Sequence, residues 1–252
     1  MAGPLTSIVM LTMNEFKCTE LALRSIAAHT PERHEIIVVD NGSTDGTPGK
    51  LRGWPRVRVI ANAENRGFAG GSNQGILAAA GDELLLLNND VIVTPGWLAG
   101  LRRALDFGPR IGMAGPVSNN VSGIQLDRGA AYGTGEELLA YAAANAARNA
   151  GQLLRVDRLV GFALLFRRNL VNRIGLLDER FGRGNFEDDD YCRRARIAGF
   201  DLVVARDVFI HHFGSRTFKA NGIDYAAQME ENRIRYVAKW TLPPAPQHAL
   251  PR

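Results

Sequence analysis

The densest group of potentially reactive side chains in this sequence is a run of four carboxylates, Glu187 to Asp190. Adjacent carboxylates repel one another unless neighbouring groups balance their charge. Three arginines follow at helical spacing and can supply that balance, namely Arg193, Arg194 and Arg196. A carboxylate in such a cluster can act as a general base, although acids at the start of a helix are also favoured by the helix dipole. Both interpretations stay open on these residues alone.

A second candidate centre combines Asp90 with a histidine pair, His211 and His212. Asp90 follows a very apolar strand-like run that ends at Leu87. A hard divalent cation that bridges a diphosphate needs one or two carboxylate oxygens, and an imidazole can complete a metal site that carboxylates begin. The alternatives are that Asp90 only forms a turn or caps a strand end, and that the two histidines have a purely structural role.

Polar side chains also gather where three expected strands end, at residues 12–15, 40–45 and 88–90. In open α/β sheets, ligands bind beyond the carboxyl ends of the strands, so these clusters are expected to meet. Asp40 can accept a hydrogen bond from a ribose hydroxyl or a base N–H, or can form an Asx-turn. Residues 62–73 place three glycines and Arg66 before a helix, where phosphate binds readily. This stretch is neither a Walker A motif nor a dinucleotide fingerprint.

The elements that must position these groups alternate between short β-rich runs and helix-length stretches, which predicts an α/β fold with a largely parallel sheet. Strands are expected at Ser7–Leu11, Glu35–Asp40, Val57–Ile60, Glu83–Leu87, Ile111–Val117, Leu159–Phe166, Leu202–Ala205 and Val208–His211. Helices are expected through Cys18 and Ile26, and at Gly70–Ala80, Pro95–Leu105, Asp188–Ala198 and Tyr225–Trp240. Residues 118–135 are expected to be loop, and residues 136–150 an Ala-rich helix or a mobile flap.

The composition of the chain narrows its class. It has 252 residues, of which 46% are hydrophobic and 22% charged, so wholesale disorder is excluded. The net charge of +4 permits contact with phosphates or an anionic membrane surface but indicates neither. No apolar run approaches the ~18–20 residues of a membrane span, and no basic residues precede the first apolar stretch as in a secretory leader. Cys18 and Cys192 form neither a metal-type spacing nor a disulfide framework. A location in the reducing cytoplasm is therefore expected.

Taken together, several segments resemble glycosyltransferase family 2, the large inverting group with the GT-A fold, and are most similar to its bacterial rhamnosyltransferase-like and polysaccharide-assembly members. In the family's order, the segments are SIVMLTMNE, IIVVDNGSTDGT, ENRGFAGGSNQGI, ELLLLNNDVIVTPGWL, VGFALLFRR, IGLLDERF, FEDDDYCRRARIAGF and FIHHFGSRTF. The resemblance covers residues 5–218. It implies one GT-A domain over residues 1–218, with a Rossmann-like, mostly parallel central sheet flanked by helices. Residues 5–117 would form its nucleotide-sugar half and residues 118–218 its acceptor half, followed by a C-terminal helix and tail at 219–252.

The resemblance also implies roles for individual residues. Asp188 is expected to be the general base, with Glu187 beside it, and Asp90 and His212 are expected to hold Mg²⁺ or Mn²⁺. The residues expected to surround the nucleotide sugar are Thr12, Asn14, Glu15, Asp40, Asn41, Ser43, Asn65, Arg66, Gly67, Asn73 and Asn89. Asn88 and Asn89 stand where many relatives carry acids, so this metal site is expected to be weaker or to depend on the phosphates of the substrate.

The expected reaction moves a sugar from a UDP- or dTDP-linked donor to a hydroxyl of a glycan or lipid-linked acceptor, in one displacement that inverts the anomeric centre. A related nucleotidyltransferase would need a basic glycine-rich loop after the first strand, and residues 12–15 supply none. A non-catalytic sugar-nucleotide or glycan-binding module of the same fold is the alternative, and the asparagines before Asp90 support it. Nucleic acid is not expected as a partner, because the basic residues alternate with acids.

Two further features stay open in the sequence. The arginines of the acceptor half are either a solvated charged face or a surface that attracts an anionic acceptor or the inner face of the membrane; they are Arg167, Arg168, Arg173, Arg180 and Arg183. The helix at residues 225–240 is expected to pack on the core, with a dimer contact as the alternative. The oligomeric state is not predicted.

Overall fold

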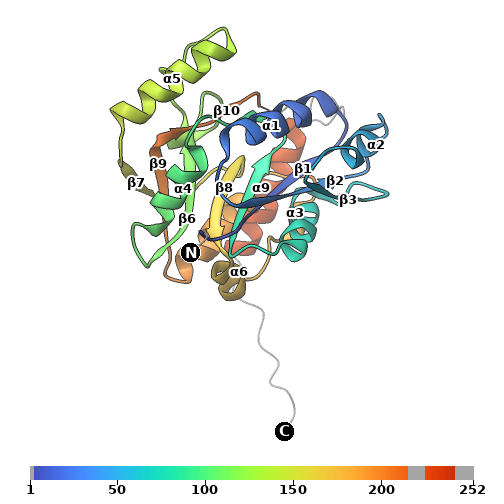
Figure 1. The fold of residues 1–252 in the computed structure, drawn as a ribbon. Coiled ribbons are helices and arrows are strands. Elements are labelled where there is room, and N and C mark those ends of the chain that lie inside the picture. Colours follow the sequence, from blue (N-terminus) through green and yellow to red (C-terminus); the bar gives the residue numbers. More distant parts are fainter. Residues whose placement is uncertain (1–2, 215–224, 242–252) are drawn as a thin grey trace.

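A large central sheet forms the core of the computed structural model, which describes residues 3–214 and 225–241. Its strand order is β3-β2-β1-β4-β8-β6-β9-β7 (Figure 1). The strands are β1 (Thr6–Thr12), β2 (His34–Asp40), β3 (Val57–Ala61), β4 (Glu83–Asn88), β6 (Ile111–Val117), β7 (Leu153–Val156), β8 (Ala163–Arg167) and β9 (Asp201–Phe209). Strands β1 to β4 pair in parallel, as do β6 and β9. Strand β8 is antiparallel to β4 and β6, and β7 is antiparallel to β9, so these two strands make the sheet mixed.

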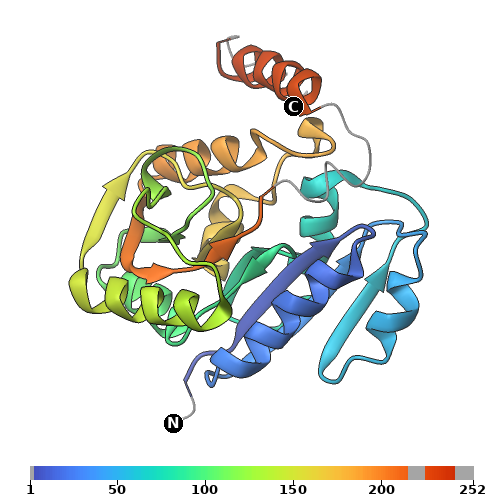
Figure 2. The same cartoon turned by 90° about the horizontal axis from the view of Figure 1, so that it is seen from above.

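Helices cover both faces of this sheet (Figure 2). They are α1 (Phe16–His29), α2 (Thr47–Arg52), α3 (Gly67–Ala78), α4 (Trp97–Asp106), α5 (Gly135–Arg148), α6 (Arg168–Ile174), α7 (Glu187–Ile197) and α9 (Tyr225–Thr241), with 3₁₀ turns η1 (Gly123–Gln125) and η2 (Glu179–Phe181). Helices α1 and α4 contribute to one hydrophobic cluster, and α3 and α7 to the other. Side chains alternate along a strand, so Ile8 and Met10 of β1 join the first cluster and Val9 joins the second.

A second, two-stranded sheet joins two segments that are far apart in the sequence. Strands β5 (Val91–Ile92) and β10 (His211–His212) pair antiparallel, with His212 opposite Val91. The N–H group of Phe213 donates to the carbonyl oxygen of Asp90 at 2.9 Å and extends this pairing. Because Asp90 directly precedes β5, the small sheet brings the histidine segment to Asp90.

The predicted strand at Leu159–Phe166 starts later than expected, at Ala163. The backbone N–H groups of Val160 and Gly161 donate to the side chains of Gln125 (2.7 Å) and Asp188 (2.8 Å), so they are not used in a strand ladder. The two strands predicted at residues 202–205 and 208–211 were also wrong as separate elements. They are one strand, β9, with an irregularity in its register opposite Pro116 and Val117, followed by β10.

The helical interpretation of residues 136–150 is confirmed as α5. Thr134 caps this helix by accepting from the N–H of Glu137, whose carboxylate accepts from the N–H of Thr134 in return. The sequence did not predict β5, β7, α2 or α6. The expected domain boundary at 218/219 lies outside the described residues. Within the described ranges, no helix combines the length and apolar character needed to cross a membrane.

Candidate functional site

A cavity of about 570 Å³ lies beyond the carboxyl ends of β1 and β4 and is closed on one side by the start of α7. The predicted site residues that line it are Thr12, Asn41, Asn65, Gly67, Asn89, Asp90, Glu187, Asp188 and His212. The predicted residues outside its lining are Asn14, Glu15, Asp40, Ser43, Arg66 and Asn73. The fold therefore brings the glycine-rich turn, the end of β4, the acidic run and the histidine segment to one place.

Asp90 and His212 meet directly in this cavity. The Nε2 atom of His212 lies 3.1 Å from Oδ1 of Asp90, and both side chains are nearly buried. The other ring nitrogen, Nδ1, lies 2.7 Å from the carbonyl oxygen of Asn120, which can only accept, so we assign the proton to Nδ1. In a neutral ring, the lone pair of Nε2 then faces a carboxylate oxygen. A cation between these two acceptors resolves that conflict.

The donor set around this pair fits a hard divalent cation. In octahedral coordination with metal–ligand distances of about 2.1 Å, two neighbouring ligand atoms are about 3 Å apart. The separation of Nε2 of His212 and Oδ1 of Asp90 is close to this value. A metal-bound histidine commonly donates its second N–H to a backbone carbonyl, as His212 does to Asn120. In residues 3–214 and 225–241, no cluster of three His, Cys, Asp or Glu side chains could hold a metal. Diphosphate oxygens and water would have to fill the remaining positions, which is the usual way for Mg²⁺ to bind.

The acidic run lines the same cavity, at the start of α7. Asp188 is 7% exposed, and its Oδ2 and Oδ1 atoms accept from the N–H groups of Gly161 (2.8 Å) and Asp189 (2.9 Å). Burial, followed by the negative charge of Asp188, raises the pKa of Glu187 well above its usual range. The same two causes raise the pKa of Asp189 to about 7, against the opposing effect of Arg158 at 2.5 Å. The run therefore does not carry four full charges near neutral pH.

Asn41 organises the glycine-rich turn from the end of β2. Its amide group donates to Oδ1 of Asn65 and to the carbonyl oxygen of Gly67, both at 3.0 Å. Its own Oδ1 atom accepts from the N–H of Arg66 at 3.1 Å. These bonds hold the turn in the shape that opens helix α3, whereas the side chain of Arg66 is exposed.

The ends of β1 and β2 are also joined by side chains. The N–H of Asn14 donates to the hydroxyl of Ser43 at 2.7 Å, and Asn14 and Glu15 both adopt left-handed backbone conformations, with φ of 57° and 54°. Asp40 accepts from the N–H of Ser43 through Oδ1 at 3.0 Å. Its Oδ2 atom is buried and finds no hydrogen-bond partner within the described part of the chain. Such a carboxylate oxygen is suited to accept from a hydroxyl or N–H group of a ligand.

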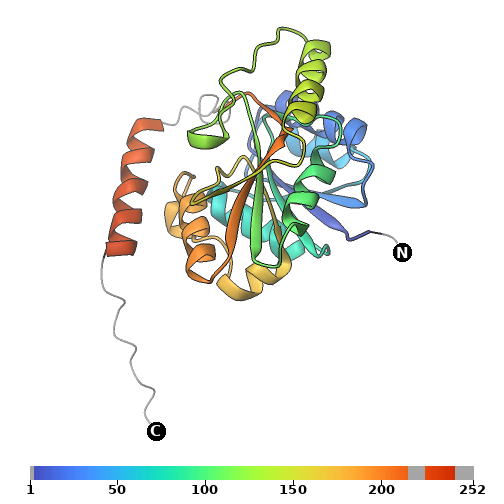
Figure 3. The same cartoon turned by 90° about the vertical axis from the view of Figure 1, so that its left-hand side faces the viewer.

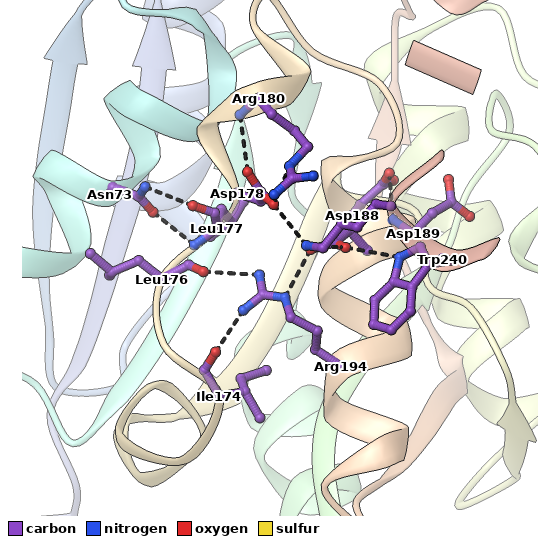
Figure 4. Close-up of polar contacts among 12 residues, drawn as sticks. Asn73, Ile174, Leu176, Leu177, Asp178, Arg180, Asp188, Asp189, Arg194 and Trp240 are labelled. Carbon is purple, nitrogen blue, oxygen red and sulfur yellow. Dashed lines mark hydrogen bonds and ion pairs between the residues drawn. The ribbon is translucent and has the colours of Figure 1, made fainter. Parts of the chain in front are cut away.

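Two predicted nucleotide contacts are engaged in bonds within the fold. Asn89 donates to the hydroxyl groups of Thr12 (3.3 Å) and Thr19 (3.0 Å) and so joins β4 to β1 and α1. The amide of Asn73 donates to the carbonyl of Leu177 and to Glu179, and its oxygen accepts from the N–H of Leu177. Asn73 thus connects α3 to the segment before η2, as Figure 4 shows.

Three of the five arginines that could attract an anionic acceptor have partners within the protein. Arg167 pairs with Asp106, Arg180 pairs with Asp178, and Arg168 donates to the backbone carbonyls of Ala79 and Gly81. Arg183, in contrast, lines the cavity. Three of the five arginines therefore contribute to the fold itself.

Several residues that complete the site were not predicted from the sequence. Arg158, Asn120, Tyr225 and Met229 also line the cavity. Asn119 accepts from the N–H of His212 at 2.9 Å, beside the contact of Asn120 with the imidazole. Both asparagines follow the carboxyl end of β6, so the rule that ligands bind at strand ends could have indicated them.

Comparison with known proteins agrees with this arrangement. N-acetylglucosaminyl-diphospho-decaprenol L-rhamnosyltransferase of Mycobacterium tuberculosis is 26% identical over 94% of this chain and 86% of its own length. An uncharacterised protein of Sinorhizobium fredii is 27% identical over 84% of this chain, which covers only 25% of that protein. The mannosyltransferase PcManGT of Pyrobaculum calidifontis, solved with GDP-Man and Mn²⁺, has the same GT-A fold. Its structure matches 93% of this chain and 67% of its own chain, with a TM-score of 0.64 and 20% sequence identity. The model of glycosyl transferase family 2 matches residues 7–175, from β1 to the end of α6, and the chain belongs to that family.

Proposed function

We propose that this chain transfers a sugar from a nucleoside diphosphate sugar to a hydroxyl group of a glycan or lipid-linked acceptor, with inversion at the anomeric carbon. The observation that carries the proposal is that Asp188 and the Asp90–His212 pair line the same cavity. A leaving diphosphate needs positive charge, and an attacking hydroxyl needs a base. The cavity supplies residues suited to these separate tasks.

On the donor side, Asp90 and Nε2 of His212 would hold Mg²⁺ or Mn²⁺, which stabilises the negative charge of the departing diphosphate. Asn120 orients the imidazole through Nδ1. Asp40 does not line the cavity itself but directly precedes Asn41, which does, and its unpartnered Oδ2 atom would accept a hydrogen bond from the nucleoside. The presence of GDP-Man and Mn²⁺ in the mannosyltransferase of the same fold supports this assignment. A UDP- or dTDP-linked sugar is the donor that we propose.

On the acceptor side, Asp188 would take the proton of the acceptor hydroxyl while the oxygen attacks the anomeric carbon. The bond between that carbon and the diphosphate breaks in the same displacement, which inverts the configuration. Base catalysis of this kind contributes about 10²–10⁴-fold. No residue has to serve as a covalent nucleophile.

The acceptor itself is proposed from the cavity and from one relative. Arg158 and Arg183 line the cavity and favour an acceptor that carries phosphate. The mycobacterial relative is named for a diphospho-decaprenol acceptor. A lipid-linked diphosphate acceptor is consistent with both observations, and it would bring the enzyme to a membrane surface.

The direct test is nucleotide binding followed by turnover. Thermal unfolding is measured with UDP, dTDP, GDP and CDP, each with and without Mn²⁺. A ligand at 100 times its dissociation constant stabilises the native state by about 2.7 kcal/mol, so a metal-dependent increase in Tm for one nucleotide is expected. Donors with that nucleotide are then tested for sugar transfer, and the anomeric configuration of the product is determined by NMR. Nucleotide binding without release of sugar from any donor would favour the non-catalytic module.

A further inference from the structure

Helix α9 runs alongside the segment that contains η2 and the start of α7 (Figure 3). One face of the helix makes the contacts, since the residues involved recur every three or four positions. They are Tyr225 and Met229 in the lining of the cavity, followed by Asn232, Tyr236, Lys239 and Trp240 against the protein. The same face therefore forms part of the cavity and holds the helix that carries Asp188.

Asn232 is fully buried, although its helix is otherwise exposed or half-buried. Its amide group lies within hydrogen-bond distance of three backbone carbonyls, those of Phe181 (2.7 Å), Gly184 (2.8 Å) and Asn185 (3.0 Å). These carbonyls belong to residues 181–186, which we call the α7 entry loop. A single side chain thus satisfies acceptors along most of this loop.

The α7 entry loop needs such support because its backbone is unusual. Asn185 and Phe186 both have left-handed conformations, with φ of 74° and 72°, directly before α7. Each costs about 1–2 kcal/mol for a residue with a side chain, and it persists only where surrounding contacts hold it. The ring of Tyr236 on α9 packs against that of Phe186 with centroids 5.6 Å apart. The carbonyl of Phe186 accepts from the N–H of Asp190 and starts the helix.

The second anchor of α9 is Asp190, which is fully buried in the first turn of α7. Its carboxylate lies 2.6 Å from Nζ of Lys239 and accepts from Nε1 of Trp240 at 3.0 Å. Arg194 reaches the other carboxylate oxygen at 2.8 Å. In Figure 4, the side chains of Arg194 and Trp240 converge on this centre from different elements. A buried carboxylate with this many donors fixes the orientation of the elements that supply them.

We propose that Asn232 and Lys239 are positioning residues of the transfer reaction, through which α9 sets the α7 entry loop and the first turn of α7 so that Asp188 faces the cavity. The inference rests on the proposed role of Asp188 as the base. Asp188 lies between the two anchors, two residues after Phe186 and two before Asp190. Release of α9 would move Asp188 while leaving Asp90 and His212 on their own small sheet.

Four variants test this inference. Asn232→Asp keeps the shape of the side chain but removes both N–H donors and places a carboxylate against three carbonyls. Lys239→Met removes the ammonium group, and Lys239→Arg restores a positive charge. Arg233→Ala is the matched control, because Arg233 pairs with Glu230 on the exposed face of the same helix. For each folded variant, kcat, the KM for the donor and the Kd for nucleotide with Mn²⁺ are measured.

We expect Asn232→Asp and Lys239→Met to lower kcat at least about tenfold, since a displacement of about 1 Å can cost 10²-fold, while the nucleotide Kd changes less than about twofold. Lys239→Arg should recover most of the rate, and Arg233→Ala should match the wild type. An unchanged kcat in both loss variants overturns the inference. So does a parallel loss of kcat and nucleotide affinity, which would indicate a general structural role.

Hydrogen exchange makes this test independent of the proposed activity. In Asn232→Asp, the amides of residues 184–192 should exchange faster than in the wild type, whereas those of residues 36–40 and 84–88 should not. Unchanged protection at residues 184–192 overturns the positioning role even if no donor is found. Absence of transfer by the wild-type protein with normal nucleotide binding would instead count against the proposed function.

Discussion

The N–H group of Phe68 donates to the carbonyl oxygen of Gly182 at 3.1 Å. This bond joins the start of α3, at the glycine-rich turn, to the α7 entry loop. Gly67 precedes Phe68 with φ of 75°, and a Cβ atom at this position would overlap the same carbonyl group. The glycine-rich turn and the α7 entry loop are therefore in contact through their backbones, at a position that only glycine can occupy without a shift.

A methyl group at Gly67 should consequently be costly. Gly67→Ala combines the left-handed penalty of about 1–2 kcal/mol with overlap costs of about 1–3 kcal/mol. Gly46→Ala is the control, since Gly46 also has positive φ (82°) but nothing lies within 4 Å of its Cβ position. Urea denaturation should show the larger loss of unfolding free energy for Gly67→Ala. Equal losses in the two variants would mean that the approach to Gly182 is not tight in solution.

Removal of either member of the Asp90–His212 pair should weaken the metal-dependent binding of nucleotide. We expect Asp90→Asn and His212→Ala to lower the Mn²⁺-dependent affinity for nucleotide by about tenfold or more, because each removes one protein ligand of the proposed cation. Isothermal titration with Mn²⁺ and then with EDTA measures the difference. His29→Ala, at the end of α1, serves as the control. Full metal dependence in both variants would exclude this site.

Loss of the proposed base should affect turnover and not binding. Asp188→Asn is expected to reduce kcat by about 10²–10⁴-fold, since the amide cannot take the proton of the acceptor. The Kd for nucleotide should stay close to that of the wild type. The control is Asp157→Asn, which alters an exposed carboxylate that pairs with Arg196. Turnover near the wild-type rate in Asp188→Asn would show that another group accepts the proton.

The raised pKa of Asp189 predicts a specific dependence of stability on pH. Because its pKa is about 7 in the native state and about 4 in the unfolded chain, the native state binds more protons between these values. Its contribution to stability is therefore greatest below pH 4 and is lost as pH rises towards 7. Asp189→Asn should be more stable than the wild type at pH 8, by about 1–2 kcal/mol after solvent screening, and should lose that advantage at pH 4.

Denaturation of the two proteins across that pH range measures this prediction. A constant difference between them would mean that Asp189 titrates normally and that its pairing with Arg158 outweighs its burial. The same series on Asp157→Asn shows what an exposed carboxylate contributes.

The sequence predicts well those elements whose side chains alone decide their structure. Strands β1, β2 and β4 are buried on both faces and are continuous apolar runs, so their positions followed from composition and pattern. Strand β7, in contrast, is half-exposed with no clear alternation, and β5 and β10 have two residues each. These strands form because a strand that is distant in the sequence supplies their hydrogen-bonding partner, and a local sequence pattern cannot indicate that partner.

The site shows the same division. Motifs at Asp90, Asp188 and His212 could be read from the sequence, and the fold brings all three to one cavity. Asn120 contributes to the site through a backbone carbonyl, and its residue type carries no signal of that. Asn232 lies in a polar, mostly exposed helix, where an asparagine is common and predicts no particular role. Only the structure shows that its amide group contacts three backbone carbonyls.

During synthesis, Asp90 emerges from the ribosome before His212, which follows it by 122 residues in the sequence. Strands β1 to β4 can pair as soon as they emerge, but β5 has no strand beside it until β10 follows. A growing chain therefore acquires one side of the proposed cation site early and the other only after most of the sheet is in place. A fragment that stops at residue 175, where the family match ends, would contain Asp90 but not His212, and would therefore hold only one of the two protein groups of the proposed cation site.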